Sequence, residues 1–476
     1  MAVLTLALGI GAVTAMFSVV TAVLLRPLPF PEPNRIVAAG PRAKLSGQVN
    51  SSSYPDFFDY RSRSHSFESL AAYHDVDQTL TGVGDPLHVR AVMASSGFFQ
   101  AVGVQPMLGR SFRPEEEQPG QHVAILSNRL WRERFGADPN VIGRGITVRD
   151  RPFTVIGVMP EGFQFPIAAE ATDLWMSISR DAEGDLPGDT PVTQERGAHF
   201  LSIVGRLKPG VTPEQAQTEL EGITQSLARE YPDTDTNFSL AYVRPELETL
   251  VGDTRTPLMI LLAAVGFVLL IACANIANLL LARSTGRTRE IALRAALGAT
   301  RTRIVRQLVT EAVLLAGGGA AFGLLISAFS TNALARLYPQ NLPRLQQVTI
   351  DYPITLFTVA LALLSAVLFG LAPALQMARP RLESALKEGG RNGTSSIQHT
   401  RLRSLLVISE TALGVVLLVG AGLLIRSFRQ LQRVDPGFNP HGILTLNFDL
   451  PSGRYTNAVS DVSTALSSSG CAACRE

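Results

Sequence analysis

Charge and cysteine are both scarce in this sequence of 476 residues. Asp, Glu, Lys and Arg make up 17% of it and hydrophobic residues 46%, whereas soluble domains carry about 25% charged residues. This composition argues against a disordered chain and against a wholly soluble protein. Three cysteines, two of them among the last six residues, are too few for the disulfide framework of a small secreted domain.

The motifs of common enzymes are also missing. The sequence has no GxxxxGK[ST] phosphate loop, HExxH zinc motif or GxSxG nucleophile elbow. Carboxylate pairs such as Asp56 with Asp59, or Asp75 with Asp77, need spatial evidence before a catalytic role can be assigned. We therefore predict no catalytic, metal or cofactor site, and the charge pattern is not that of a nucleic-acid-binding protein. Five scattered histidines are expected at the surface or in satisfied core positions: His65, His74, His88, His122 and His199.

Long apolar runs are what the sequence has instead. Four uncharged stretches reach the roughly 20 residues that cross a bilayer, namely 1–25, 256–282, 312–335 and 352–378. A fifth, 405–425, qualifies with Glu410 near one end. The first run lacks the basic start of a signal peptide and is longer than its apolar stretch. We predict five transmembrane helices in a lipid bilayer, in preference to buried helices of a soluble enzyme.

Charge is segregated along the chain. Residues 26–256 hold 22 Lys and Arg against 30 Asp and Glu, and the rest of the chain holds 20 against 10. The loops 283–311 and 379–404 are rich in arginine, whereas the loop 336–351 is not. Because basic loops stay on the cytoplasmic side, these two loops and the amino terminus are predicted inside, and residues 26–255 outside the cytoplasm.

Residues 26–255 have the pattern of a mixed α+β domain. Strands are predicted at 122–126, at 200–207 and twice within 146–158, with a turn near Asp150. Ser127 is a candidate N-cap for a helix over 128–135, and Thr212 for a helix that runs from Pro213 to Glu230. The predicted fold class is an α-helical membrane protein with an inserted extracytoplasmic α+β domain.

The arginine-rich segment 283–311 is the most informative stretch. Thr288 is predicted to begin a short amphipathic helix that ends at Gly298, and Thr300 to begin the helix that enters the third span. The short helix lies along the membrane surface or docks on a cytoplasmic partner, and headgroup binding by its arginines is the alternative. A weaker amphipathic helix is predicted within 379–404. Two pairs lie one turn apart in the short helix: Leu293 with Leu297, and Glu290 with Arg294.

Four polar or small residues inside the spans are candidates for helix packing. Asn275 and Asn278 stand three apart in the second span and are predicted to hydrogen-bond to neighbouring helices. Gly319 and Gly323 form a GxxxG pattern in the third span, which permits close helix approach and dimerisation.

Several of these segments resemble those of MacB/FtsX-type ABC transporter permeases. The coupling-loop motif of that family is similar to residues 289–299 (REIALRAALGA) together with Glu311. Its periplasmic core domain is similar to residues 26–30 (RPLPF), 107–112 (MLGRSF) and 155–160 (VIGVMP). Residues 386–390 (LKEGG), 420–424 (GAGLL) and 434–438 (VDPGF) resemble the long, duplicated form of these permeases.

The resemblance implies a permease subunit of the bacterial cytoplasmic (inner) membrane that works with an ABC-type ATP-binding subunit. ATP is bound by that partner, so no cofactor is expected in this chain. Hydrolysis would move the extracytoplasmic domain, for efflux or mechanotransmission. A second permease copy and a periplasmic adaptor are further implied partners. The implied contacts with the ATP-binding subunit are Glu290, Leu293, Arg294, Leu297 and Gly298.

The resemblance also predicts a chain that is cut at both ends. A segment before the first span is expected to be missing, and residues 426–476 are expected to begin a second extracytoplasmic domain. The CxxC at Cys471 and Cys474 is assigned no site. The alternative hypothesis is a membrane-anchored sensor or scaffold that regulates an extracytoplasmic partner without transport. A membrane enzyme is the weakest hypothesis, since the sequence contains no recognisable set of catalytic residues.

Overall fold

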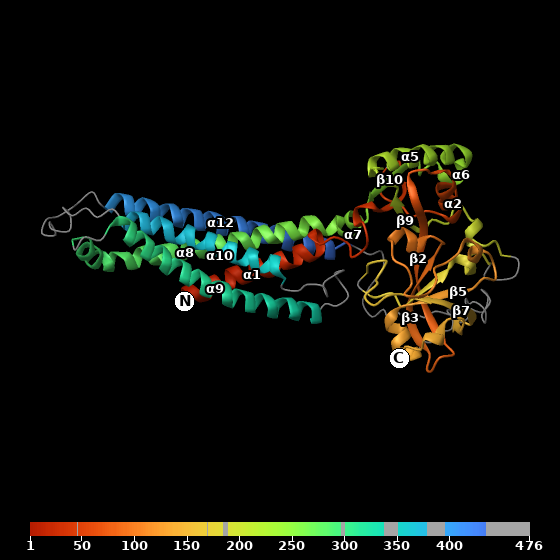
Figure 1. The fold of residues 1–476 in the computed structure, drawn as a ribbon. Helices are drawn as coiled ribbons and strands as arrows, with labels where there is room; N and C mark the ends of the chain where they lie inside the picture. Colours follow the sequence, from red (N-terminus) through yellow and green to blue (C-terminus); the bar gives the residue numbers. More distant parts are fainter. Residues whose placement is uncertain are drawn as a thin grey trace, which may run out of the picture. The chain divides into compact units, whose positions relative to one another are not determined.

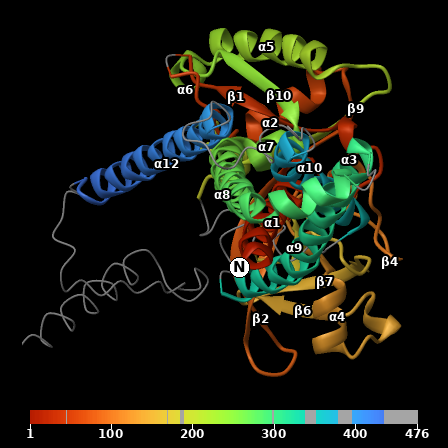
Figure 2. The ribbon, with the colours of Figure 1, turned by 90° about the vertical axis from the view of Figure 1, so that its left-hand side faces the viewer.

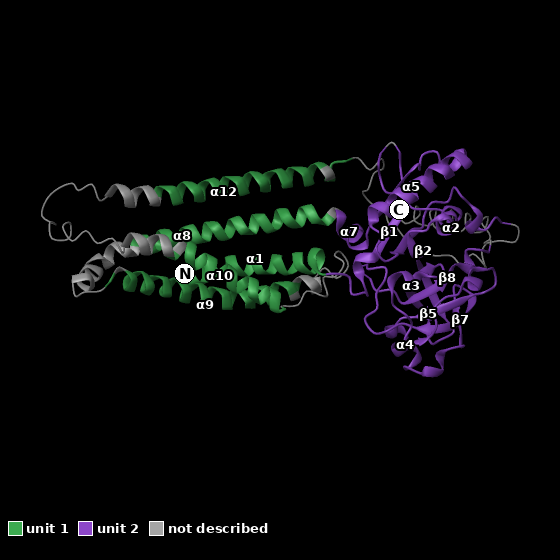
Figure 3. Cartoon of the chain, turned by 45° about the horizontal axis from the view of Figure 1, so that its top comes forward, with its two compact units in different colours: residues 1–26, 253–443 green, residues 27–252, 444–476 purple. Residues whose placement is uncertain are grey.

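The chain divides into two units, which Figure 3 colours separately. The computed structural model describes residues 1–44, 46–168, 170–183, 189–296, 300–337, 351–377 and 396–434. Residues 1–26 and 253–443 form the first unit, which we call the helical unit. We call residues 27–252 of the second unit the sheet domain.

The helical unit consists of long helices, and each predicted apolar run lies in one of them (Figure 1). By length and composition, the stretches Ala2–Leu25, Arg255–Ala282, Thr302–Thr331 and Ser404–Gln430 could each cross a membrane. In α10 the apolar stretch within the described residues is the shorter Tyr352–Leu368. The helices are α1 (Ala2–Val20, continued by a π-helical turn at Thr21–Leu25), α8 (Arg255–Ala296), α9 (Arg301–Leu337), α10 (Tyr352–Met377) and α12 (Ser396–Gln432).

The second apolar run and the segment after it form one helix. α8 continues without a break to Ala296, so the prediction of a separate helix that begins at Thr288 is wrong. Residues 283–296 contain no proline, and their four arginines and three alanines favour helix continuation over a new N-cap. α9 begins at Arg301, directly after Thr300, as predicted. Gly298 and most of the segment 379–404 lie outside the described residues.

Ten strands of the sheet domain form one mixed sheet. Their order is β10-β1-β9-β2-β3-β8-β5-β7-β4, and β6 pairs with β2 and β7. The pairs β3–β8 and β5–β7 are parallel and the others antiparallel. The strands are β1 (Ile36–Arg42), β2 (Phe67–Thr81), β3 (Leu87–Ala94), β4 (Leu108–Gly109), β5 (Val123–Leu126), β6 (Gly145–Val148), β7 (Arg151–Val158), β8 (Leu174–Ser177), β9 (Ser202–Leu207) and β10 (Leu240–Pro245).

Six α-helices accompany this sheet, and their local signals explain where they begin. The Ser127 hydroxyl accepts the Leu130 N–H at 3.1 Å. The Thr212 hydroxyl accepts a hydrogen bond from the Gln215 N–H at 3.3 Å, and the Gln215 side-chain oxygen accepts one from the Thr212 N–H at 3.0 Å. Both predicted N-caps are therefore confirmed. The helices are α2 (Tyr54–Arg63), α3 (Phe98–Val102), α4 (Asn128–Phe135), α5 (Pro213–Glu230), α6 (Pro232–Asp235) and α7 (Glu246–Val251).

The predicted turn near Asp150 is also confirmed. Arg149 and Asp150 both adopt positive φ angles, of 47° and 61°. They connect β6 to β7, which pair antiparallel with Val148 opposite Arg151. Two successive left-handed residues match the right-handed twist of the flanking strands, as in type I′ hairpins.

The chain enters and leaves the sheet on neighbouring strands. β1 follows α1 in the chain, and β10 precedes α7 and α8. These two strands pair antiparallel from Val37 opposite Pro245 to Arg42 opposite Leu240. The sheet domain is thus an insertion between α1 and α8, and main-chain hydrogen bonds tie its first and last strands together.

Two of the glycine-containing segments noted in the sequence meet in this sheet. Gly109 of β4 pairs with Gly157 of β7. Gly109 has a φ of +77°, and a Cβ there would lie 2.1 Å from the Ile156 carbonyl oxygen. A Cβ at Gly157 would lie 2.9 Å from the Arg110 carbonyl oxygen. Only glycine fits at these two paired positions of β4 and β7, because each clash is with main-chain atoms that cannot rotate away.

We expect Gly109→Ala to lower the free energy of unfolding of the sheet domain by about 2 kcal/mol, through overpacking and the left-handed backbone. Gly145→Ala is the matched control, since a Cβ there meets nothing within 4 Å. Tryptophan fluorescence of the detergent-purified chain during heating measures the effect, because Trp131 and Trp175 both lie in this domain. Equal midpoints for the two variants would contradict the packing described.

Candidate functional site

α1 packs against three other helices of the helical unit. Figure 2 shows it among α8, α9 and α10, with each of which it is in contact. Its buried residues Leu6, Ile10 and Val13 belong to one apolar cluster with residues of those helices. The partners in this cluster include Leu269, Cys273, Ile276 and Ala277 of α8, Ala312, Ala316 and Ala320 of α9, and Ala362 and Ala366 of α10.

Glycines allow α1 and α9 to approach backbone to backbone. A Cβ at Gly323 would lie 3.0 Å from the Gly11 nitrogen, and one at Gly11 would lie 2.9 Å from the Gly323 carbonyl oxygen. A Cβ at Gly319 would lie 2.7 Å from the Leu6 Cβ. The GxxxG face of α9 is therefore occupied by α1 of the same chain. Sequence reasoning missed Gly11, although Ala7 and Gly11 form a small-xxx-small pattern that could have found it.

Polar and aromatic contacts join α1 to α10. The Thr14 and Thr358 hydroxyls lie 3.1 Å apart and are both buried. The rings of Phe17 and Phe357 stack with centroids 3.8 Å apart and planes 11° from parallel. Thr358 also donates to the Ile354 carbonyl at 2.8 Å, which leaves its oxygen free to accept from Thr14. A hydrogen bond between helices fixes their relative rotation more narrowly than apolar packing does.

The two predicted asparagines have different surroundings. Asn275 is exposed on α8. Asn278 is half-buried, and its side-chain oxygen has no hydrogen-bond partner among the residues with a described position. The structure therefore does not bring these two side chains into one hydrogen-bonded contact, and their role in helix packing stays a prediction.

The end of α8 carries three of the five residues predicted to contact a partner. Glu290, Leu293 and Arg294 lie in its last turns, whereas Leu297 and Gly298 lie outside the described residues. α8 has 42 residues, so its length is about 63 Å. A hydrocarbon core is about 30 Å thick. The segment 283–296 extends roughly 21 Å past the apolar part of the same helix.

A buried polar cluster lies in the sheet domain. Asp56 of α2, Asp235 of α6 and His199, which precedes β9, place their ligand atoms within 4.8 Å of one another. His199 Nε2 is 3.3 Å from Asp56 Oδ2. Arg196 contacts the other oxygen of Asp56 and donates to Asp59 at 2.7 Å. Sequence reasoning missed this cluster, because its members come from three distant segments.

The electrostatics of the cluster follow from its burial. Burial and the negative charge of Asp56 raise the pKa of Asp235 to about 6. Burial acts to lower the pKa of His199, but its contact with the Asp56 carboxylate outweighs this and the pKa is raised. Burial likewise opposes ionisation of Asp56, yet its contacts with His199, Ser53 and Arg196 lower its pKa.

Two family models match this chain, one in its amino-terminal half and one further along. A family model described as MacB-like periplasmic core domain matches residues 1–223, and one described as FtsX-like permease C-terminal matches residues 262–381. The chain is 27% identical over 305 residues to the probable syringafactin export ATP-binding/permease protein SyfD of Pseudomonas syringae pv. tomato, covering 64% of this chain and 41% of that protein. It is 28% identical over 309 residues to the macrolide export ATP-binding/permease protein MacB of Chromobacterium violaceum, covering 64% and 42%.

A solved structure is also similar. The periplasmic region of MacB from Actinobacillus actinomycetemcomitans is 14% identical and covers 50% of this chain and 95% of its own, with a TM-score of 0.34. The chain spans about two fifths of the length of the curated relatives it matches.

The apolar helices and the inserted mixed sheet define a multi-pass membrane protein with an extracytoplasmic α+β domain, which confirms the predicted fold class. The two family models together span most of the chain. The chain belongs to the MacB/FtsX-type ABC transporter permease family, as the resemblance of its motifs predicted.

We expect Gly323→Val to separate α1 from α9, because two methyl groups would be forced against the backbone of Gly11, at a cost of about 1–3 kcal/mol. Gly317→Val lies on the same helix, where a Cβ meets nothing within 4 Å, and should behave as the unchanged chain. The measurement is the temperature at which half of the detergent-purified protein leaves the monodisperse peak in size-exclusion chromatography. If Gly317→Val lowers this temperature as much as Gly323→Val, the glycine contact is not the cause.

Proposed function

We propose that this chain is a permease subunit that couples ATP hydrolysis by a separate subunit to movement of its extracytoplasmic domain. The observation that carries the proposal is the continuity of α8. One helix contains the second apolar stretch and, beyond it, Glu290, Leu293 and Arg294. Its other end follows α7 and β10 in the chain, with only Gly252–Thr254 between α7 and α8. A helix transmits a push along its axis because its hydrogen bonds resist compression.

The contact with the ATP-binding subunit is assigned to the end of α8 and the residues after it. Leu293 and Leu297 would supply the apolar part of this contact, and Glu290 and Arg294 its polar part. Gly298 would let the chain leave the helix before α9 begins at Arg301. ATP would be bound by the partner, and this chain would supply no cofactor of its own. The relatives are named export ATP-binding/permease proteins, so each combines an ATP-binding part with a permease part, which supports coupling of this permease to ATP binding.

The proposed orientation places the amino terminus and the end of α8 in the cytoplasm of a bacterium, across the inner membrane from the sheet domain. The arginines of 283–311 support it. A second copy of the permease and a periplasmic adaptor complete the proposed assembly. Because the GxxxG face of α9 is covered by α1, the second copy would contact another face, and α12 offers one that is exposed in the single chain.

We expect Leu293→Asp to abolish co-purification of a co-expressed ABC-type ATP-binding subunit, because a carboxylate would replace an apolar contact. Val434→Asp is the matched control: it makes the same kind of change at an exposed residue just after α12, on the side proposed to be extracytoplasmic. Stimulation of ATP hydrolysis by the purified complex is the second measurement. Unchanged co-purification of Leu293→Asp would reject the assigned contact, whereas failure of the unchanged chain to bind any ATP-binding subunit would favour a sensor or scaffold.

The proposed orientation predicts opposite labelling of two introduced cysteines. In a chain whose Cys273, Cys471 and Cys474 are replaced by serine, Ser62→Cys of the sheet domain should react with a membrane-impermeant maleimide in intact spheroplasts. Thr288→Cys should react only after the membrane is permeabilised. Labelling of both residues, or of Thr288→Cys alone, in intact spheroplasts would overturn the orientation.

A further inference from the structure

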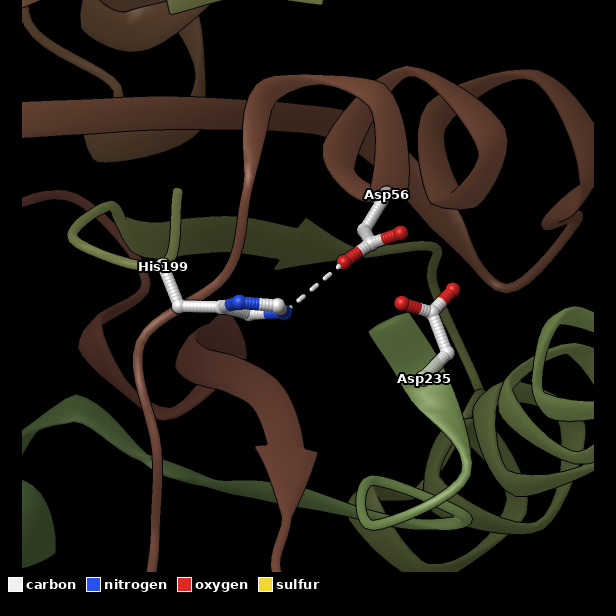
Figure 4. A group of neighbouring side chains, drawn as sticks. All are labelled: Asp56, His199 and Asp235. Carbon is white, nitrogen blue, oxygen red and sulfur yellow. Dashed lines mark ion pairs between the residues drawn. The ribbon is translucent and has the colours of Figure 1, made fainter. Parts of the chain in front are cut away.

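In the polar cluster of the sheet domain, three side chains direct possible ligand atoms toward one common point. Figure 4 shows the side chains of Asp56, His199 and Asp235 converging from separate segments. His199 Nδ1 lies 3.2 Å from the Gly197 carbonyl oxygen, which can only accept, so Nδ1 carries the proton. In the neutral imidazole, Nε2 then directs a lone pair at Asp56 Oδ2, 3.3 Å away. A positive charge relieves this contact, either as a proton on Nε2 or as a bound metal ion, and Nε2 makes no hydrogen bond to the described residues.

Asp235 supplies an independent sign of a ligand. It is 97% buried, and neither carboxylate oxygen has a hydrogen-bond partner among the described residues. Arg196 Nη1 forms an ion pair with Asp235 Oδ2 at 3.7 Å, which is beyond hydrogen-bond distance. A buried carboxylate without hydrogen bonds is costly, and this one faces the same point as Asp56 and His199 (Figure 4).

The surrounding charges leave room for a divalent cation. Arg196 contacts Asp56, Asp59 and Asp235 and stacks over the Tyr231 ring at 3.8 Å, so three carboxylates share one guanidinium charge. Arg63 pairs with Asp59 and Glu230 at the rim. Four carboxylates therefore face two guanidinium groups, so negative charge is in excess with His199 either neutral or protonated.

We propose that Asp56, His199 and Asp235 bind a divalent transition-metal cation, and that the ion is Zn²⁺. One imidazole nitrogen and two carboxylate oxygens form a donor set that suits zinc, whereas Ca²⁺ and Mg²⁺ prefer oxygen alone. The Nδ1–H···O=C bond to Gly197 is the outer contact that commonly orients a metal-bound histidine. The ion joins α2, the segment before β9 and α6, which precedes the edge strand β10. This departs from the expectation that the histidines are scattered, and it is independent of the proposed transport function.

The test uses the full chain in detergent, purified without a histidine tag and with Cys471 and Cys474 replaced by serine, so that the CxxC cannot bind zinc. After EDTA treatment and removal of the chelator, ZnCl2 is added, and bound zinc is measured by elemental analysis after dialysis. We expect about one zinc ion per chain. We also expect the thermal midpoint, followed by tryptophan fluorescence, to rise by about 3 °C or more with zinc.

Asp235→Asn and His199→Gln should each lose the bound zinc and the rise in midpoint. Asp233→Asn, an exposed residue of the same helix, should keep both. Asp235→Asn should fold without zinc at least as well as the parent chain, since it removes a buried charge that accepts no hydrogen bond, and its midpoint without zinc checks this. Zinc binding by Asp235→Asn and His199→Gln equal to that of the parent would overturn the proposal. So would a parent chain that binds no zinc.

Discussion

The contact between Gly11 of α1 and Gly323 of α9 is the constraint on which the helical unit depends. A Cβ at either position would come within 3.0 Å of the other backbone. Apolar side chains alone give little specificity to helix association in a membrane, because lipid tails are as apolar as leucine. Close backbone approach does give specificity, since it gains dispersion contacts only where both helices have small residues at the contact. It holds α1 in place although the whole sheet domain separates it from α8 and α9 in the chain.

The sheet domain can be inserted between α1 and α8 without disturbing this contact, because its first and last strands are neighbours. β1 and β10 are neighbours in the sheet, so the chain leaves α1 and returns toward α8 on paired strands. The insert can then be a complete sheet with its own buried core without drawing α1 and α8 apart. Within that sheet, Gly109 and Gly157 allow β4 to cross β7 closely, and both belong to segments that resemble the family.

Local features were predictable from the sequence, and their physical cause is local. Ser127 and Thr212 begin helices because each hydroxyl bonds an N–H three residues away. Thr288 has the same chemistry and yet lies inside α8, because a cap contributes only about 1 kcal/mol and arginine and alanine, the commonest residues of 283–296, favour helix. The motif residues Glu290, Leu293 and Arg294 were identifiable from the resemblance alone, and the structure adds that their helix is continuous with the second apolar stretch.

The sequence by itself determined the membrane class, the apolar helices, the α+β character of residues 26–255 and the family, because hydropathy, capping and motif spacing act over a few turns of chain. Only the tertiary structure decided which surface the glycines of α9 contact. It also decided that Asp56, His199 and Asp235 share one buried point. Those contacts join segments far apart in the chain. A local sequence pattern cannot predict them, because they depend on how β9, α2 and α6 pack together.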